Sequence, residues 1–228
     1  AYYDLNSSRY SIDAYTYSTG NPYLLPQFTY NSELTYSYQN TLFVTLGYSL
    51  TRNNITSVLI PDEEQKIMLQ TLVNLDRFDY FNLNISYSKK LTQWWTTNTS
   101  LLPYYGIYVG NINNYSINRG MPSFQFNSNN SFLLKGGLSM ECSFMYLHRN
   151  YDGFGIMKSY YDFSPGIQKK LFHKQGAVTI NIKDLFWTYS PKGTTNLGGV
   201  KETWNSKIDT RVIGVNFTYN FGSGQIHK

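Results

Sequence analysis

The sequence is poor in charge, in cysteine and in long apolar runs. Lys, Arg, Asp and Glu make up 14% of its 228 residues, against roughly 25% in ordinary soluble domains. A single cysteine, Cys142, excludes an internal disulfide framework and a cysteine-based zinc cluster. No stretch approaches the roughly 20 consecutive apolar residues that a membrane-spanning helix needs. These shortages exclude a disulfide-stapled domain and a helical membrane protein.

Aromatic and uncharged polar residues take the place of charge. Aromatics reach 18%, with 22 Tyr and 14 Phe, which excludes a disordered chain because such chains are poor in aromatics. The pI is about 9.0, but no Arg-rich run or nucleic-acid motif accompanies it, so we expect no nucleic-acid partner. Residues 1–20 lack the basic start and apolar stretch of a signal peptide. We therefore expect a processed precursor or a piece of a larger protein.

Strict alternation of apolar and polar residues is the main structural signal. On 28–38 one set of alternate positions holds Phe28, Tyr30, Leu34, Tyr36 and Tyr38, broken only by Ser32. The same period returns over 42–51, 82–88 and 213–221. Successive side chains of a strand point to opposite sides, so these segments are expected to be two-faced strands.

The alternation predicts nine strands. They lie at 27–38, 42–51, 66–88, 94–109, 122–132, 138–150, 157–170, 177–188 and 205–221. The third strand loses its phase around Asp76–Asp79, which predicts a bulge or bend there. Short connections at 39–41, 89–93, 133–137 and 171–176 alternate with longer ones at 52–65, 110–121, 151–156 and 189–204.

Long antiparallel strands with short turns at one end and long loops at the other are typical of an outer-membrane barrel. Its apolar side meets lipid, its polar side meets water, and closure pairs every backbone donor within the hydrocarbon. A soluble β-sandwich also alternates, but its strands are shorter and its buried face is rarely so rich in Tyr. We therefore predict an all-β, antiparallel transmembrane β-barrel.

Aromatic placement supports two girdles at the membrane surfaces. If the last strand ends in the periplasm, the inner girdle holds Tyr36, Tyr38, Tyr87, Trp94, Trp95, Tyr219 and Phe221. The outer girdle then holds Tyr48, Tyr104, Tyr105, Tyr108, Tyr146, Tyr160, Tyr161, Trp187 and Tyr189. Chance placement in a Tyr-rich sequence is the alternative.

Short motifs in a fixed order resemble a known family. The segment Gly20-Asn21-Pro22-Tyr23-Leu24-Leu25-Pro26-Gln27, followed by Glu33-Leu34, resembles the GNPxLxPE…EL segment of TonB-dependent receptor barrels. Three further segments are similar to segments of the Bacteroidota-type outer membrane protein beta-barrel family. They are the stretch from Arg9-Tyr10 to Tyr17-Ser18-Thr19, the motif Asp184-Leu185-Phe186, and the terminal Tyr219-Asn220-Phe221-Gly222. Asn74 fits that family's Asn in the long strand. Gln27 stands where an acidic residue is usual, and Asn84 stands where many relatives have Glu.

The resemblance implies a protein with a signal peptide, an N-terminal plug and about twenty-two strands, in the bacterial outer membrane. This chain would be its C-terminal portion, without a plug or TonB box. Residues 1–26 would be an extracellular loop region, 27–221 the C-terminal half of the barrel, and 222–228 a periplasmic tail. The implied partners are outer-membrane lipids, a surface lipoprotein, and TonB acting through a plug outside this chain.

Residues that could carry chemistry are few. No GxSxG occurs, and the three histidines, His148, His173 and His227, are dispersed, so we expect no enzyme, cofactor or metal site. Cys142 is expected to be a small apolar strand residue. Glu33, Glu141 and Asp162 are predicted to project inward, where they line a polar lumen or bind other wall residues or a plug. No substrate-binding residue is nominated.

Three functions are compatible with this sequence. The leading hypothesis is a TonB-dependent-receptor-like transporter that forms a plugged conduit for an unidentified ligand. The second is a structural or scaffold barrel that holds lipoprotein partners in an assembly or secretion complex. A barrel enzyme using His148 near the outer rim is the third.

Overall fold

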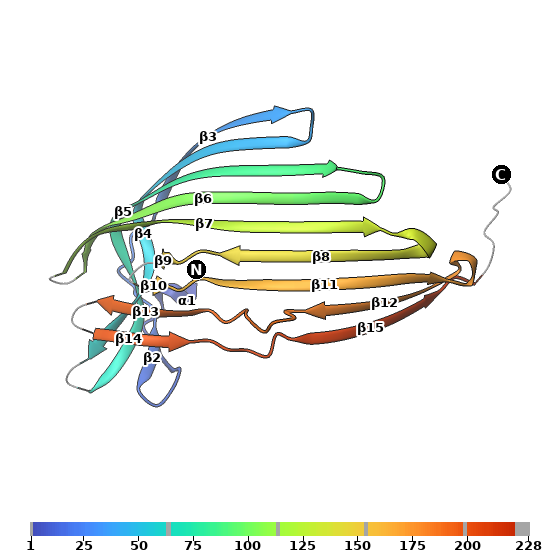
Figure 1. Cartoon of the computed structure of the whole chain (residues 1–228). Coiled ribbons are helices and arrows are strands. Elements are labelled where there is room, and N and C mark those ends of the chain that lie inside the picture. The colour runs from blue at the N-terminus through green and yellow to red at the C-terminus, as the bar shows by residue number, and fades with distance from the viewer. Residues whose placement is uncertain (1, 63–64, 113–114, 153–154, 198–199, 222–228) are drawn as a thin grey trace, which may run out of the picture.

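Nine long strands follow one another in a single antiparallel sheet in the described part of this computed structural model, residues 2–62, 65–112, 115–152, 155–197 and 200–221 (Figure 1). They are β3 (Phe28–Tyr38), β4 (Leu42–Asp62), β5 (Ile67–Lys90), β6 (Trp95–Ile112), β7 (Tyr115–Leu133), β8 (Leu138–Leu147), β11 (Tyr160–Leu171), β12 (Gly176–Lys183) and β15 (Val212–Tyr219). Each lies beside its predecessor, so the all-β, meandering fold is confirmed. The tail 222–228 lies outside the described residues.

Shorter elements gather at one end of this sheet, which we call the far end; the tight connections form the other, the turn end. They are α1 (Tyr2–Leu5), β1 (Arg9–Ser11), β2 (Thr16–Thr19), β9 (Asn150–Asp152), β10 (Gly155–Met157), β13 (Lys192–Leu197) and β14 (Val200–Asn205). Strand β2 joins β5 in parallel, and β14-β13-β10-β9 form a second sheet. Among the described helices none has the length and apolar character to span a bilayer.

Three connections predicted as long loops are β-hairpins, and this part of the prediction is wrong. Strands β4 and β5 stay paired to Asp62 and Ile67, and β6 and β7 to Ile112 and Tyr115. Most of 189–204 forms the β13–β14 hairpin. These hairpin extensions do not alternate cleanly, because no apolar solvent on one side imposes that period on them.

The bulge or bend predicted around Asp76–Asp79 is a bend. The pairing of β4 with β5 keeps one register on both sides of Asp76, from Arg52–Arg77 to Asn54–Leu75, so β5 has no bulge, but its pairing with β6 ends at Arg77 and beyond it β5 turns across β6. The distortion lies in β4, where Asn53 has φ 51°. The strands predicted at 177–188 and 205–221 are shorter, because the chain leaves the ladder after Lys183 and rejoins it at Val212.

The two faces of the sheet differ in chemistry. One row of paired residues runs Tyr36, Val44, Ile85, Leu101, Phe126, Tyr146 and Tyr161 across seven strands. We call this side the apolar face. The neighbouring row on the other side runs Ser37, Phe43, Ser86, Ser100, Asn127, Met145 and Asp162, and we call that side the polar face. The predicted alternation therefore holds across strands as well as along them.

The strands are strongly tilted. A row of directly opposite residues runs across the sheet from Tyr38 of β3 to Phe163 of β11. Between them it passes through Leu42, Tyr87, Thr99, Ser128 and Phe144. Strand β11 continues from there to Leu171, eight residues further toward the turn end. That offset is about 26 Å along the strands, against about 29 Å across six strand spacings. If the turns lie at one level, the tilt is about 40°, within the range of β-barrels.

This tilt sets the height of the apolar band. On the apolar face of β5, Phe81, Leu83, Ile85 and Tyr87 lie between Asp79 and Lys89. Ten residues at about 2.5 Å of height each give about 25 Å, the height of the apolar band of membrane barrels.

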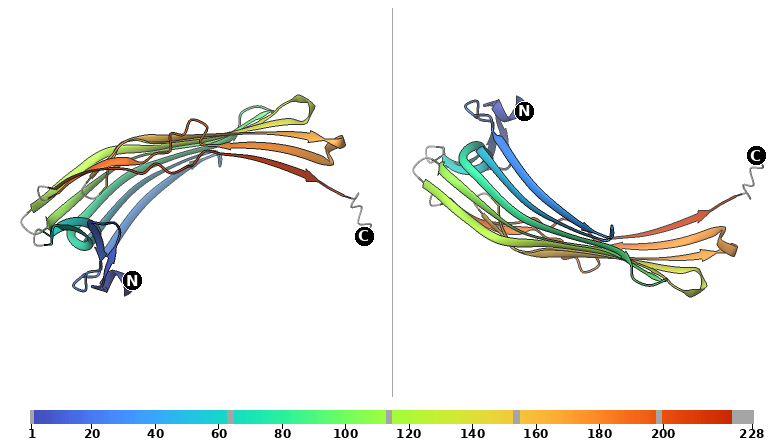
Figure 2. Two further views of the ribbon diagram at one scale, coloured as in Figure 1. Left: turned by 90° about the horizontal axis from the view of Figure 1, so that it is seen from below. Right: turned by 90° about the horizontal axis from the view of Figure 1, so that it is seen from above.

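The sheet is curved and open. Strand β3 pairs only with β4, and β15 only with β12, so one edge of each is unpaired within the described chain. The α1–β2 segment and the far end of β4–β5 lie on the concave side (Figure 2). There Val58, Leu75, Ile112 and Ile117 form a buried cluster, against which Tyr108 of the polar face packs. The polar face is therefore the concave one.

Gly110 permits this inward fold. A Cβ at Gly110 would lie 2.8 Å from the backbone nitrogen of Asp76 and 3.0 Å from the Cα of Leu75. Pairing of β5 with β6 ends just before this crossing, at Arg77 and Val109. Beyond it β5 turns across β6, and only a residue without a side chain fits between them.

Candidate functional site

The N-terminal segment is fastened to β4 and β5 by amide side chains. The Nδ2 of Asn74 donates to the carbonyl oxygens of Leu25 and Asn53, at 3.0 and 2.8 Å, and its Oδ1 accepts from the backbone nitrogen of Leu25 at 2.8 Å. The Oε1 of Gln27 accepts from the backbone nitrogen of Ile55 at 3.0 Å. A carboxylate oxygen could accept the same bond, so Gln27 can replace the acidic residue usual in the resembling segment.

Asn21 of the same motif binds further along β5. Its Nδ2 donates to the carbonyl oxygen of Leu72 at 2.9 Å, and its Oδ1 accepts from the backbone nitrogen of Tyr23. Arg9 of β1 also pairs with Asp62 of β4, at 3.7 Å. The description of 1–26 as an extracellular loop region stays a prediction, but within it the chain forms a hairpin held against the long strands.

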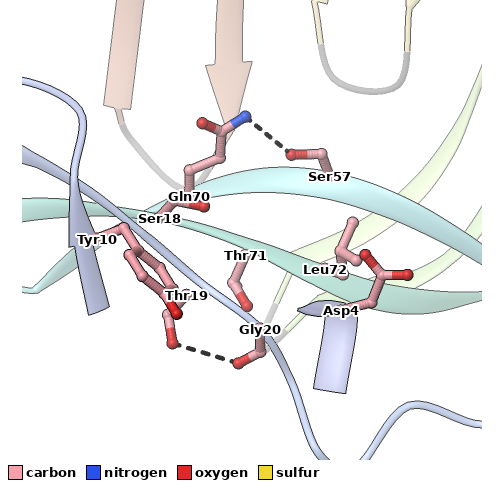
Figure 3. Close-up of a pocket in the computed structure, with 9 residues that line it drawn as sticks. All are labelled: Asp4, Tyr10, Ser18, Thr19, Gly20, Ser57, Gln70, Thr71 and Leu72. Atoms are coloured by element: carbon pink, nitrogen blue, oxygen red, sulfur yellow. Dashed lines mark hydrogen bonds between the residues drawn. The ribbon is translucent and has the colours of Figure 1, made fainter. Parts of the chain in front are cut away.

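This fastening encloses a hollow of about 520 Å³ between the N-terminal segment and the β4–β5 hairpin. Figure 3 shows the side chains around it, which come from α1, β1, β2, β4 and β5. The lining residues are Asp4, Tyr10, Ser18, Thr19, Gly20, Ser57, Gln70, Thr71 and Leu72. Hydroxyl and amide groups dominate this set.

A second hollow of about 310 Å³ adjoins the first. Both are lined by Ser57 and Gln70, whose side chains lie 3.3 Å apart, with the Nε2 of Gln70 donating to the Oγ of Ser57. The second hollow reaches Gly155, Thr195 and Glu202, so it extends from β5 to the second sheet. Strands distant in the sheet thus meet over the concave face.

A group of aromatic rings lies on the polar face toward the far end. By register Phe78 and Tyr80 of β5, Tyr104 and Tyr108 of β6, and Tyr160 of β11 all share this face. Adjacent rings contact one another: Phe78–Tyr108 centroids are 4.4 Å apart and Tyr80–Tyr104 centroids 5.6 Å. We call these residues, with Tyr151 and Tyr189, the tyrosine cluster.

The cluster continues into the far-end elements. Tyr151 of β9 meets Tyr108 at 5.9 Å, and Tyr189 meets Tyr160 edge-on at 5.2 Å. The Nδ2 of Asn150 donates to the hydroxyl of Tyr104, while its Oδ1 is buried without a hydrogen-bond partner.

The outer girdle predicted from sequence is therefore partly wrong. Tyr48, Tyr105, Tyr146 and Tyr161 belong to the apolar face, but Tyr104, Tyr108 and Tyr160 belong to the polar face. Adjacent residues of one strand cannot share a face. The adjacent pairs Tyr104–Tyr105 and Tyr160–Tyr161 already indicate in the sequence that one tyrosine of each pair lies on the polar face. The girdle prediction used only the position of each tyrosine along its strand and therefore missed this.

The three carboxylates predicted to project inward all lie on the polar face. Glu33 is paired with Gly47, and Gly47 with Asn82. Glu141 is paired with Gly166, and Gly166 with Asn181. Asp162 accepts a hydrogen bond from the Oγ of Ser164 at 2.6 Å. Separate strands carry them, and the structure does not bring them into one cluster.

The other titratable candidates lie apart. The ring of His148 stacks on Phe124 of the apolar face, with centroids 5.0 Å apart, and its Nδ1 lies 3.1 Å from the hydroxyl of Tyr146. His173 lies in the turn after β11, Cys142 is half-buried on the apolar face, and His227 lies outside the described residues. In the part of the chain that is described, no three His, Cys, Asp or Glu side chains group in a way that could hold a metal ion.

Asp184 is a fully buried carboxylate that sequence reasoning did not single out chemically. It accepts hydrogen bonds from the backbone nitrogens of Thr188 and Tyr189, at 2.9 and 3.2 Å, and from the hydroxyl of Thr210. Burial alone would raise its pKa, but these donors outweigh burial and the pKa is lowered. The Asp184-Leu185-Phe186 motif thus builds the turn in which the chain leaves β12.

Comparison with known families agrees with this geometry. A family model described as "Outer membrane protein beta-barrel family" matches residues 1–219. Comparison with curated proteins and with solved structures gives no match. The match covers nearly all of the chain, including every strand of the curved sheet. The chain therefore belongs to the outer membrane protein beta-barrel family, and its place is the bacterial outer membrane.

Proposed function

We propose that this chain is one wall of a TonB-dependent-receptor-like transporter, a plugged conduit that takes up a solute across the outer membrane. The observation that carries the proposal is the two-faced, tilted sheet, in which β3 and β15 each have one edge unpaired within the described residues. Unpaired edges are costly within hydrocarbon, so further strands must close the wall. A barrel of about twenty-two strands, with this chain as its C-terminal portion, is part of the proposal.

The two faces fit such a conduit. Outer-membrane lipids would cover the convex, apolar face, where Leu46 and Ile85 lie. The concave face presents Asn, Ser and Thr with scattered carboxylates, which can hydrogen-bond water, a solute or a plug. The hollows and the tyrosine cluster at the far end would then form the entrance from outside. Transport energy would come from TonB acting on the plug.

The test uses the full-length protein in its own cells. Growth on a panel of carbon, iron and vitamin sources is compared among wild type, a deletion of this gene, and a deletion of TonB. We expect one solute whose uptake is lost in both deletions and restored by the full-length gene. Uptake that survives loss of TonB, or a full-length protein without a plug, would contradict the proposal.

A scaffold barrel is the second candidate, and the ordered far end favours it. Instead of irregular loops, the chain presents a second four-stranded sheet beside the N-terminal hairpin. Such a surface could hold a lipoprotein in an assembly or secretion complex. Stoichiometric partners that co-purify, together with unchanged solute uptake after gene deletion, would decide for the scaffold.

We further propose that the chain has no catalytic role. The contacts of His148 are with Phe124 and Tyr146, an arrangement suited to the membrane–water boundary. Any hydrolytic activity of the purified full-length protein that is lost in His148→Ala would argue for the enzyme hypothesis instead.

A further inference from the structure

We propose that the tyrosine cluster, with the hollows at the same end of the sheet, binds a neutral, polyhydroxylated solute, a sugar whose ring faces lie on the tyrosines. This inference rests on the proposed transport function and names the solute class. Lipid explains aromatic side chains on the apolar face, but it does not explain Tyr80, Tyr104 and Tyr160 on the concave side.

The rings form one group of contacting rings on β5 and β6 and a separate pair, Tyr160 with Tyr189. From Phe78 the contacts run to Tyr80 at 6.0 Å and to Tyr108 at 4.4 Å, then from Tyr80 to Tyr104 at 5.6 Å. Gly106 lies beneath, and a Cβ there would be 3.0 Å from the ring of Phe78. Flat rings packed over a glycine leave faces that are apolar and edges that carry hydroxyls, which suits the mixed surface of a sugar ring.

Hydrogen-bonding groups surround these rings. The Oδ1 of Asn150 is buried and unpartnered beside Tyr104. Elsewhere at the far end, the first hollow is lined by the hydroxyls of Ser18, Ser57 and Thr71 and the amide of Gln70.

The charge of the hollows disfavours anions. The chain as a whole has a net charge of +5, yet among the described residues that line the two hollows there is no Lys or Arg. Asp4, Asp13 and Glu202 line them instead. Arg119 lies close enough to Tyr151 of the cluster to interact with its hydroxyl. Ferric chelates and phosphorylated solutes would meet repulsion on entry, whereas a neutral solute would not.

The experiment measures binding to the purified full-length protein in detergent, which requires no TonB. The probe is an array of neutral oligosaccharides with matched uronic-acid and sulfated oligosaccharides. We expect binding to neutral members. Tyr104→Ala and Tyr160→Ala should weaken it by at least about tenfold, while Tyr104→Phe keeps the ring and should change affinity by less than about threefold.

The chain supplies matched controls, because each of these tyrosines has a tyrosine neighbour on the apolar face. Tyr105→Ala and Tyr161→Ala remove the same side chain from the same strands and should leave binding unchanged. Tyr104→Leu keeps most of the volume without the aromatic ring, so it separates loss of stacking from loss of folding. It should weaken binding as Tyr104→Ala does.

Each other outcome counts against the inference. No binding to any neutral oligosaccharide, binding confined to the anionic ones, or equal losses in the Tyr104 and Tyr105 variants would overturn it. Its failure is distinguishable from failure of the proposed function. TonB-dependent uptake of an anionic solute would contradict only the assignment of a sugar as the solute. Sugar binding without TonB-dependent uptake would contradict only the proposed transport function.

Discussion

Asn74 shows how one side chain can hold a whole segment in place. In the middle of β5 it would be an ordinary polar strand residue, but its amide bonds both the nitrogen and the oxygen of Leu25, like another strand. Its remaining donor hydrogen reaches the carbonyl of Asn53, where β4 leaves the regular ladder. The irregular backbone of β4 and the entry of the N-terminal segment therefore depend on the same residue.

We predict that Asn74→Ala detaches the N-terminal segment without unfolding the sheet. Three hydrogen bonds are lost, each worth about 1 kcal/mol, so amides of 16–26 should exchange hydrogen at least about tenfold faster. Hydrogen exchange followed by mass spectrometry measures this. Asn118→Ala, at an exposed asparagine of β7, is the control and should leave that protection unchanged. Equal protection in both variants would show that Asn74 is dispensable.

Asp184 ties the end of β12 to the residues before β15. Its pKa is lowered in the folded chain because the donors from Thr210, Thr188 and Tyr189 outweigh the effect of burial. A carboxyl with a lowered pKa contributes stability that is present above its unfolded pKa of about 3.9 and is lost as pH falls through the folded value. Local stability at this break should therefore decline below about pH 4.

The variant Asp184→Asn should remove that acid-dependent decline and lower stability at neutral pH by about 2–3 kcal/mol, because charge-assisted bonds are replaced. Urea unfolding of the detergent-solubilised protein at pH 7 and at about pH 3 gives both quantities. Asp209→Asn changes an exposed carboxyl of the same connection and should alter neither. A pH response that persists in Asp184→Asn would assign the effect to other carboxyls.

At the scale of elements, the long strands divide at Arg77 and Val109 into a wall and a far-end lobe. Sequence predicted the wall well, since lipid on one side and water on the other impose the period of two on every strand. Sequence missed the lobe, where the segment from Tyr115 to Met121 is stabilised by pairing with β6 rather than by any alternation. Composition alone cannot distinguish such a polar hairpin from a loop.

We predict that Gly110→Ala disrupts the lobe and spares the wall. The new Cβ would meet the backbone of Leu75 and Asp76 at 2.8–3.0 Å, and backbone cannot move aside as a flexible side chain does. Protease sensitivity near 53–76 and 110–117 should rise, while the heat-resistant mobility of the barrel on gels persists. Gly214→Ala is the control, because no atom of the described chain lies within 4 Å of a Cβ there. Equal resistance to protease in the two variants would contradict a tight crossing of β5 over β6 at Gly110.

At the scale of the molecule, the assignment of lipid and water to the two faces can be tested with neighbouring residues. Ile85 lies on the apolar face about midway along the apolar band, and Asn84 lies beside it on the polar face. We predict that Ile85→Lys lowers stability by about 2–4 kcal/mol, the cost of a cation facing lipid near the bilayer midplane, and that Asn84→Lys costs little. Folding into bilayers of the full-length protein, titrated with urea, supplies both values. Equal costs would mean that neither face meets lipid.

The sequence defined the faces of the molecule better than it defined the candidate site. Alternation placed Glu33, Glu141 and Asp162 on the polar side, because parity is a local property. The hollows depend on contacts between Ser57 and Gln70 and between the N-terminal hairpin and distant strands. Such contacts depend on how far β4 and β5 bend across the sheet, which no period in the sequence encodes. The tyrosine cluster lay between these cases: the parity of its strand residues indicates their face, although Tyr104, Tyr108 and Tyr160 were predicted in the outer girdle, and the ring contacts required the fold.

The oblique course of the strands shapes the route that a solute would take. Each strand is displaced by more than one residue relative to its neighbour. A solute that moves along the axis of the barrel therefore passes from one strand to the next. The residues that it contacts in succession belong to different strands, so its path relative to the chain is helical. A deletion of two residues that shifted a single hairpin would therefore remove the solute contacts at one depth of the conduit. The contacts above and below that depth would remain.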